Sequence, residues 1–517
     1  MFYCTVTSIK NWILGDPLID YLNAFVDKSA LSTPYFKECD FTNFIMDMGN
    51  KYEEIVVNNL IEKCKNLNLT YTIVERKQGY HQTKNAISKN TDIIFQAQVK
   101  DWDRNIIGYP DIIVTKKAFL KLFKLSSQAA IYELSKVKDN HYIVIDVKYS
   151  SIDSTNGFID EKTKYHRFIR AQIAMYTNIG KFKSNIGFII SKDLQTIETP
   201  IATYTNDKCL IEDYEKAIDW LIRLYKEGKE WDINKHLIPE LYPNMNNVMD
   251  GAWREHKQKL AINLKEISLI SGIGDIIRDK LRSNNIYSYD NPRFIEFLEK
   301  CVDKDTKTYN RILTIRNNLL SNNNINYIQG NNSILTSVEY IYVDIETCSK
   351  FNLYGTHKTY LTGISLLHSD ITKCFIVDHL SEEQETNIID KFKEYLNSIE
   401  KNIVLVHYSS VEDKFFKKNN INYTTIDLYT IITNEFDKGN KCIIDICEYD
   451  FSLKSIVSKL EDVYSKCKIK NGLEVLTAYQ KDIIKDEIKE EIIKYNIADC
   501  EALKILHSYF IKNSLLI

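Results

Sequence analysis

Two apolar stretches in the N-terminal half decide the fold expected there: GYPDIIV, residues 108–114, and HYIVIDVKYS, residues 141–150. Both are rich in β-branched residues and have the length of a strand, so each is predicted to form one. Asp111 stands at the start of the first strand. Asp146 and Lys148 lie two residues apart on the second strand, so their side chains share one face. Two acids and a lysine at strand ends suit metal-assisted phosphodiester hydrolysis, because carboxylates hold Mg²⁺ and a lysine stabilises the attacking water or the developing negative charge.

The segments on either side of these strands add further polar residues. KYHRFIRAQIAMYTNI, residues 164–179, has helical spacing and places Gln172 and Tyr176 on one helix face. An earlier helix is predicted from about Phe41 to Leu67 and carries Glu53, with Glu54 as the alternative acid. The lysine-rich insertion of residues 115–140 separates the two strands by more than a tight hairpin, so their pairing is left open.

Taken in order, these features resemble the RecB-like branch of the PD-(D/E)xK nucleases. The Pro110–Asp111 dipeptide and the Asp146-Val147-Lys148 tripeptide match the superfamily pattern, and AQIAMY (171–176) and GNKYEE (49–54) match the QxxxY and GxxxE elements of the branch. The resemblance implies a restriction-endonuclease-like α/β core over residues 1–235. It also implies a set of catalytic residues and a set of metal ligands. The catalytic residues would be Asp111, Asp146, Lys148, Gln172 and Tyr176, and the ligands of Mg²⁺ or Mn²⁺ would be Glu53, Asp111 and Asp146.

Basic side chains precede Gln172 on the same predicted helix and its approach. They are Lys162, Lys164, His166, Arg167 and Arg170. One interpretation is an edge that contacts phosphates beside the metal site, with Lys164, Arg167 and Arg170 as the DNA contacts. The other interpretation is an ordinary solvated helix face.

The zone of residues 236–330 is predicted to be mostly helical. ISLISGIGDIIRDKLRSNNI, residues 267–286, resembles a helix-hairpin-helix motif, in which Gly272 and Gly274 permit the tight turn. Backbone N–H groups at the start of the second helix would then face a DNA phosphate. The alternative is a connector that only mediates protein packing. The zone ends in an Asn-rich stretch, residues 317–333, which is interpreted as a linker.

A second acidic pattern lies in residues 335–517. YIYVDIETCS, residues 340–349, places Asp344 and Glu346 on one face of a predicted strand, and YNIADCEAL, residues 495–503, places Tyr495 and Asp499 on one helix face. This zone resembles the RNase H-like, DnaQ-type exonucleases of the DEDDy pattern. In those enzymes four acids bind two metals and the tyrosine helps to orient the attacking water, so the resemblance implies an RNase H-like α/β domain with a catalytic Tyr495.

One acid of that second pattern departs from the family. VLVHYSSVEDKFF, residues 404–416, offers Glu412 or Asp413 where an Asp is usual, and Tyr408 stands where the family has Asn. Mg²⁺ sites tolerate geometric change poorly, so activity of this centre is left open. The predicted ligands here are Asp344, Glu346, Glu412, Asp413 and Asp499. Asp427 also fits an acid that recurs between the motifs of the family.

Whole-chain properties limit the other possibilities. The chain has 517 residues, 11 cysteines and a formal net charge of −3, so any grip on nucleic acid needs local basic patches rather than bulk charge. The cysteines form no CxxC, which gives little support to an iron–sulfur cluster. The sequence also lacks a GxxxxGK[ST] motif, so no bound nucleotide is expected. No long apolar segment predicts a secretory signal or a membrane span, so an intracellular protein of the cytoplasm or nucleus is expected.

Over nearly its full length the chain resembles predicted RecB-family nucleases that carry a C-terminal RNase H-like domain and are often joined to a helicase. The expected fold is α/β and multidomain, and the expected function is metal-dependent cleavage of DNA, with DNA as partner and a helicase as a separate polypeptide. Two alternatives stay open. One is a nucleic-acid-binding scaffold without robust catalysis, and the other is a nuclease directed at RNA.

Overall fold

The computed structural model describes residues 4–31, 33–193, 195–233, 238–321, 338–353, 357–437, 451–481 and 484–512. The chain divides into two compact units. Unit 1 comprises Met1–Leu31, Thr42–Tyr242 and Asn352–Thr356; unit 2 comprises Ser32–Phe41, Pro243–Phe351 and His357–Ile517. The predicted helical zone of residues 236–330 therefore falls mostly in the same unit as the predicted C-terminal domain.

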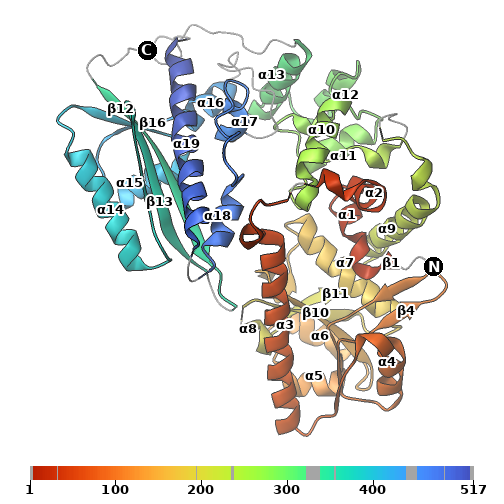
Figure 1. Cartoon of the computed structure of the whole chain (residues 1–517). Helices are drawn as coiled ribbons and strands as arrows, with labels where there is room; N and C mark the ends of the chain where they lie inside the picture. The colour runs from red at the N-terminus through yellow and green to blue at the C-terminus, as the bar shows by residue number, and fades with distance from the viewer. Residues whose placement is uncertain are drawn as a thin grey trace. The chain divides into compact units, whose positions relative to one another are not determined.

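An eight-stranded mixed sheet forms the centre of unit 1 (Figure 1). In spatial order its strands are β2 (Tyr71–Ile73), β3 (Ile93–Phe95), β6 (Ile112–Thr115), β7 (Tyr142–Lys148), β10 (Ile186–Ser191), β11 (Ile201–Tyr204), β9 (Phe158–Ile159) and β8 (Ser154–Thr155). Strands β6, β7 and β10 occupy the middle and are buried almost throughout, which explains their continuous apolar sequences.

The two strands quoted first are neighbours in this sheet. β6 and β7 run antiparallel, with Ile112 opposite Ile145. The insertion between them folds into α5 (Lys116–Leu122) and α6 (Gln128–Ser135), whose first turns are capped by the side chains of Thr115 and Ser127. The pairing that the sequence left open therefore forms, and its register brings the segments of Asp111 and Asp146 together.

Helices and a small second sheet complete unit 1. The three-stranded sheet has the order β1 (Cys4–Thr5), β5 (Ile106–Gly108), β4 (Val99–Asp101). The remaining helices are α1 (Lys10–Ile13), α2 (Leu18–Phe25), α3 (Phe41–Asn66), α4 (Gly79–Ser88), α7 (Lys164–Ile179), α8 (Gln195–Glu198) and α9 (Lys208–Glu227). Helix α3 buries Tyr52, Val56, Leu60 and Cys64, four residues apart, against the core of the sheet.

The first part of unit 2 is helical, as the sequence predicts. It contains α10 (Arg254–Leu264), α11 (Asp275–Arg282), α12 (Phe294–Cys301) and α13 (Lys307–Ser321). Between α10 and α11 the segment before Gly272 forms a 3-10 turn over Ile267–Leu269, and the helix-hairpin-helix resemblance stays a prediction. The Glu266 carboxylate caps that turn at Ser268 N, 2.6 Å away, and Gly272 follows with a φ of +103°. The predicted linker lies outside the described residues from residue 322 onward.

A five-stranded sheet forms the rest of unit 2. Its order is β14 (Ile371–Ile376), β13 (Lys358–His368), β12 (Glu339–Lys350), β15 (Ile403–His407), β16 (Thr424–Asp427). Strand β13 runs antiparallel to both of its neighbours, β14 and β12, whereas β12, β15 and β16 are parallel. The helices here are α14 (Glu382–Asn397), α15 (Ser410–Lys418), α16 (Leu428–Asp437), α17 (Leu453–Val457), α18 (Gly472–Ala478) and α19 (Asp486–Lys512). Helix α19 packs along β12 and β13.

The mixed α/β, multidomain class expected from the sequence is confirmed, with three sheets and 19 α-helices in the part of the chain that the structure describes. None of the described helices is long and apolar enough to cross a lipid bilayer.

Candidate metal centres

The acids of unit 1 meet where β6 begins and β7 ends. The Asp111 carboxylate Oδ2 accepts a hydrogen bond from the backbone N–H of Val147, 2.7 Å away. On β7, Lys148 Nζ lies 2.7 Å from Asp146 Oδ2, and the Asp146 side chain is only 2% exposed. The antiparallel pairing of β6 with β7 thus joins all three residues into one cluster.

Helix α3 supplies a further acid to this cluster. Glu53 is half-buried and hydrogen-bonds to Asp111, whereas Glu54 is exposed. Glu53 also accepts a hydrogen bond from Gln96 Nε2. The structure therefore places Glu53, and not its alternative Glu54, beside the other acids.

Gln96 was not predicted from the sequence. It follows β3 in the left-handed region, with a φ of +55°, and its backbone N–H donates to the carbonyl oxygen of Asp111 at 2.7 Å. A non-glycine residue in this region is uncommon and often marks a constrained site. The sequence around it carries no motif, so only the fold reveals that Gln96 holds both Glu53 and the Asp111 backbone.

Burial and like charges dominate the electrostatics of the unit 1 cluster. Burial, followed by the charges of Asp146 and Glu53, raises the pKa of Asp111 well above its usual range. Burial also raises the pKa of Glu53. Burial alone would lower the pKa of Lys148, but the charges of Asp146 and Asp111 outweigh it and raise that pKa. The lysine therefore stays protonated beside carboxyl groups that crowd one another, an arrangement that favours a bound cation.

Gln172 and Tyr176 lie on α7 and contact each other. Gln172 Nε2 donates to the Tyr176 hydroxyl at 3.0 Å, and both side chains are buried. Burial, followed by the charges of Asp146 and Asp111, raises the pKa of Tyr176. Tyr176 is in turn one of the groups that raise the pKa of Lys148. The pair that the sequence placed on one helix face thus lies against the acidic cluster.

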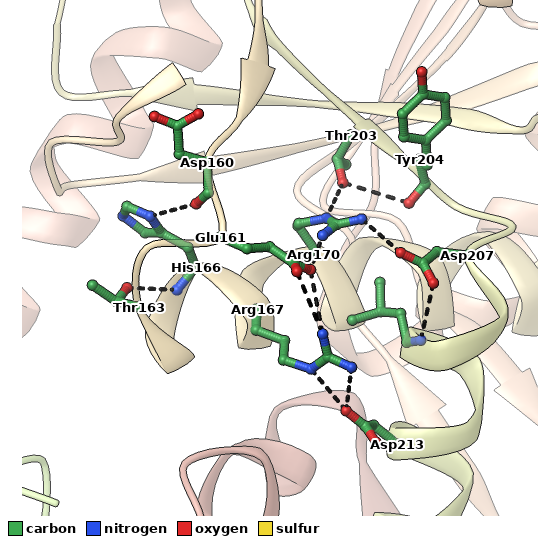
Figure 2. A network of polar contacts seen from close by, with 11 residues as sticks. Asp160, Glu161, Thr163, His166, Arg167, Arg170, Thr203, Tyr204, Asp207 and Asp213 are labelled. Carbon is green, nitrogen blue, oxygen red and sulfur yellow. Dashed lines mark hydrogen bonds and ion pairs between the residues drawn. The ribbon is translucent and has the colours of Figure 1, made fainter. Parts of the chain in front are cut away.

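The predicted basic edge on α7 is engaged with carboxylates (Figure 2). Arg170 is buried and pairs with Glu161 and with Asp207, the latter at 2.9 Å. Arg167 pairs with Asp213 at 2.5 Å. These pairs join α7 to α9 and to the segment before α7. The predicted DNA contacts of Arg167, Arg170 and Lys164 stay a prediction, and for the two arginines the structure shows acidic partners.

A second acidic cluster lies in unit 2. Asp344 and Glu346 on β12 and Asp499 on α19 each offer a carboxylate oxygen, and these oxygens lie within 4.8 Å of one another. A β-bulge follows Glu346 in the pairing of β12 with β13, and such bulges redirect side chains. Within the described residues, Asp344 Oδ2 is buried and has no hydrogen-bond partner. A divalent cation fits this set, because it would satisfy that oxygen and offset the crowded charge.

The pKa shifts in unit 2 follow from the same causes. Burial raises the pKa of Asp344 well above its usual range, assisted by the charges of Asp499 and Glu346. Burial and neighbouring carboxylates raise the pKa of Glu346 to about 8. Burial also raises the pKa of Asp499 to about 6, against a hydrogen bond from Tyr464 and the charge of Lys454. Tyr495 lies near all three acids: burial and then their charges raise its pKa.

Of the two acids considered for the fourth ligand, Glu412 lies nearer the triad. Its charge raises the pKa of both Asp344 and Glu346, and Ser409 Oγ donates to its Oε2 at 2.9 Å. Both acids also lie beside His407, with Glu412 Oε2 3.7 Å from its Nδ1 and Asp413 Oδ1 3.3 Å from its Nε2. Asp427 accepts hydrogen bonds from the backbone of Tyr429 and from Thr430 at the start of α16. The structure therefore brings together Asp344, Glu346, Asp499, Tyr495 and Glu412.

Two neighbours of the triad were missed by the sequence analysis. Tyr464 Oη donates to Asp499 Oδ1 at 2.5 Å. Asn496 is buried against Gly363, where a Cβ would lie 2.9 Å from its Nδ2. Asn496 directly follows Tyr495, so its position was visible in the sequence, but nothing in the spacing of Tyr464 links it to Asp499.

The glycines of the predicted hairpin directly precede α11. Gly274 is the N-cap residue of α11, and Asp275 in its first turn accepts a hydrogen bond from Asn244 Nδ2 at 3.1 Å. An acid in the first turn complements the helix dipole itself. The DNA contacts predicted at Gly272 and Gly274 stay a prediction.

No protein-family model and no curated protein matches the chain. Among solved structures, the chain is similar to the family B DNA polymerase from the hyperthermophilic archaeon Pyrobaculum calidifontis. The sequence identity is 11% and the TM-score is 0.26, and the match covers 43% of this chain and 34% of that chain. The chain thus spans about a third of the length of that polymerase. A likeness with this TM-score carries no argument about function.

Proposed function

We propose that the chain is a divalent-metal-dependent nuclease that hydrolyses phosphodiester bonds of DNA, and that the unit 1 cluster performs the cleavage. The observation that carries this proposal is the convergence of Glu53, Asp111, Asp146 and Lys148 at the junction of β6 and β7. Acids that crowd one another beside a protonated lysine suit a site that receives a cation and a phosphate together.

The roles of the residues follow from their positions. Glu53, Asp111 and Asp146 would hold Mg²⁺ or Mn²⁺, which supplies a polarised phosphoryl oxygen and an acidified water when bound. Lys148 stabilises the negative charge that develops on the phosphoryl group, since it is protonated and fixed by Asp146. Gln96 positions Glu53, and Gln172 positions Tyr176 next to the cluster.

The order of these elements supports the RecB-like assignment. An acid on an early helix, the Asp111 and Asp146-Val147-Lys148 strands and the Gln172/Tyr176 helix occur in the order of that branch. In unit 2, an acidic pair on a central strand and a tyrosine–aspartate pair on the last helix support the RNase H-like, DEDDy-type assignment. Glu412, which stands where Asp is usual, is held by Ser409 near the other acids, so we propose that it completes the second centre.

The test uses purified full-length protein and labelled single-stranded DNA, double-stranded DNA and RNA, with Mg²⁺ or Mn²⁺. We expect the wild type to cut DNA and the Asp146→Ala/Lys148→Ala variant to have lost that activity. The matched control is Lys63→Ala/Glu198→Ala, which removes an ion pair elsewhere in unit 1 and should cut normally.

Three results would overturn the proposal in different ways. Equal cutting by the Asp146→Ala/Lys148→Ala variant would exclude the unit 1 cluster as the catalytic centre. Cutting of RNA alone would make the protein an RNA-directed nuclease. Binding without any metal-dependent cutting would make it a nucleic-acid-binding scaffold.

A further inference from the structure

A surface pocket of about 920 Å³ in unit 1 lies apart from the acidic cluster. Its walls come from helix α4, from strand β4 with the turn that follows it, and from the C-terminal end of α7; these elements are labelled in Figure 1. The volume falls within the range of sites that bind small ligands or single nucleotide units.

Two aromatic rings dominate the wall. Trp102 and Tyr80 meet edge to face, with ring centroids 5.6 Å apart at an interplanar angle of 88°. Trp102 is 53% exposed although its side chain is large and mostly apolar. A large aromatic ring held by a neighbour, with much of its surface accessible, is the kind of platform on which a nucleobase stacks.

Cationic groups surround these rings. Lys100 Nζ lies 4.9 Å from the centroid of Trp102, and Lys84 Nζ lies 5.1 Å from that of Tyr80. Lys181 lines the same pocket. A hydrogen bond from Trp102 and the nearby lysines lower the pKa of Tyr80, as expected where the local potential is positive.

Two acids, Asp101 and Asp103, also line the wall. Arg104 Nε lies 2.8 Å from Asp101 Oδ2, so the Asp101 carboxylate is already paired. Asp103 is exposed. The lining thus holds three lysines and two acids, one of which is paired with Arg104, a composition that favours an anionic ligand.

The pocket is connected to the proposed catalytic cluster by two elements. Helix α7 contributes Asn178 and Ile179 to the pocket, just beyond Tyr176. Strand β5, which follows the Trp102 turn, passes so close to the cluster that a Cβ on Gly108 would lie 2.8 Å from the Tyr176 ring. Asp111 is nine residues from Trp102, a separation of at most about 30 Å for an extended chain. The pocket and the cluster are therefore separated by no more than that distance.

We propose that this pocket is a base-stacking subsite for a single-stranded nucleic acid, with Trp102 as the stacking platform and Lys84, Lys100 and Lys181 facing the phosphates. The inference rests on the proposed function, because the strand held here is the one that the unit 1 cluster would cut. Stacking is insensitive to sequence, so the subsite would select unpaired strands rather than a base sequence. A paired base in a duplex does not offer its face to Trp102.

The test measures fluorescence anisotropy of labelled oligothymidylate, oligouridylate and a blunt duplex of the same length with the full-length protein in EDTA. Trp102→Ala should weaken binding of the single strands roughly tenfold, as expected for the loss of one stacked base. Trp102→Phe should restore most of that loss, and duplex binding should not change. A preference of the wild type for oligouridylate over oligothymidylate would identify RNA as the source of the strand.

The matched control is Tyr132→Ala. Tyr132 is 64% exposed and has Lys136 Nζ 4.1 Å from its ring centroid, so it is an aromatic–lysine pair outside the pocket. Its loss should leave single-strand binding unchanged. Lys84→Ala should reduce the slope of log K against log salt by about 0.7, the value for one phosphate contact on a single strand.

Unchanged single-strand binding by Trp102→Ala, or an equal loss in Tyr132→Ala, would overturn the subsite. This outcome is distinguishable from failure of the proposed function. If the wild type cuts DNA but Trp102→Ala binds single strands normally, the subsite is wrong and the nuclease proposal stands. If Trp102→Ala loses single-strand binding but the wild type cuts nothing, the subsite stands without the nuclease.

Discussion

Lys148 Nζ lies 2.7 Å from Asp146 Oδ2, and the two side chains leave the same face of β7 at the end of a buried strand. The pairing holds a protonated amine next to a carboxylate that is 2% exposed. A buried ion pair costs much of its Coulombic gain in desolvation, so it is weak evidence for a role in stability. Its place beside Asp111 and Glu53 is instead explained by the chemistry proposed for the site.

Removal of charge from the unit 2 triad should stabilise the metal-free protein. Because the pKa of Asp344 is raised in the folded state, the carboxyl contributes stability at low pH that is lost as the pH rises above its unfolded value. Asp344→Asn should therefore raise the melting temperature in EDTA by roughly 2–8 °C, and the gain should grow between pH 5 and pH 8.

Addition of a cation should favour the wild type over Asp344→Asn, which is the opposite of the difference in melting temperature expected in EDTA. Mn²⁺ should raise the melting temperature of the wild type more than that of Asp344→Asn, because a ligand stabilises the state that binds it and only the wild type keeps the triad, whereas the proposed unit 1 centre is present in both. Differential scanning calorimetry with EDTA or Mn²⁺ measures both. An equal Mn²⁺ effect on the two proteins would show that the triad does not bind the metal.

Shortening Gln96 should weaken metal binding in unit 1. Gln96→Asn keeps a residue that tolerates the left-handed backbone, but its amide no longer reaches Glu53. We expect a 10- to 100-fold loss of Mn²⁺ affinity, about the size found for groups that orient metal ligands. Electron paramagnetic resonance of unbound Mn²⁺, in an Asp344→Ala/Glu346→Ala background, measures it. Gln82→Asn, which shortens a glutamine away from the acids, should bind normally; an equal loss there would mean a general effect.

Removal of the Arg170 side chain should loosen the anchorage of α7. Arg170 is 8% exposed and pairs with Asp207 at 2.9 Å, so Arg170→Ala leaves carboxylates without their partner. Because Asp207 is partly exposed, we expect a loss of about 1–3 kcal/mol in the free energy of unfolding, below the range for fully buried pairs. Urea unfolding measures it. If Arg170→Ala is as stable as the wild type but shows a smaller salt dependence of DNA binding, the side chain serves DNA contact instead.

Acidification should destabilise unit 2 through His507. The imidazole is buried against Tyr342, with 3.1 Å from Nδ1 to the hydroxyl, and burial lowers the pKa of His507 to about 4. The unfolded state then binds more protons below pH 6.5, so stability falls as the pH falls from 6.5 toward 4. The loss between pH 7 and pH 5 should be roughly 2 kcal/mol. His507→Gln should lack this component, whereas the exposed His81→Gln should retain it; identical slopes in all three proteins would contradict the assignment.

The sequence was sufficient for features that depend on local periodicity. The helix from Phe41, the helix of residues 164–179 and the strands of Asp146 and Asp344 lie where the pattern placed them. The choice between Glu53 and Glu54, and between Glu412 and Asp413, required three-dimensional packing, because adjacent residues on one helix differ only in which face they present.

Other parts of the site depend on contacts between distant segments. Gln96 reaches Glu53 across 43 residues, and Tyr464 reaches Asp499 across 35. No spacing rule joins such pairs. The carboxylate partners of Arg167 and Arg170 were missed for the same reason, since Asp207 and Asp213 lie on α9 and its cap.

The most direct test of the account is the single-turnover rate at which each centre's variant cuts a labelled single-stranded DNA with Mn²⁺. Lys148→Ala should reduce the rate by at least about 100-fold, as for the loss of one group that stabilises the transition state. Asp344→Ala/Glu346→Ala should retain metal-dependent cutting of the strand. A wild-type rate in Lys148→Ala, or loss of all cutting in Asp344→Ala/Glu346→Ala alone, would contradict the claim that the unit 1 cluster cleaves the strand.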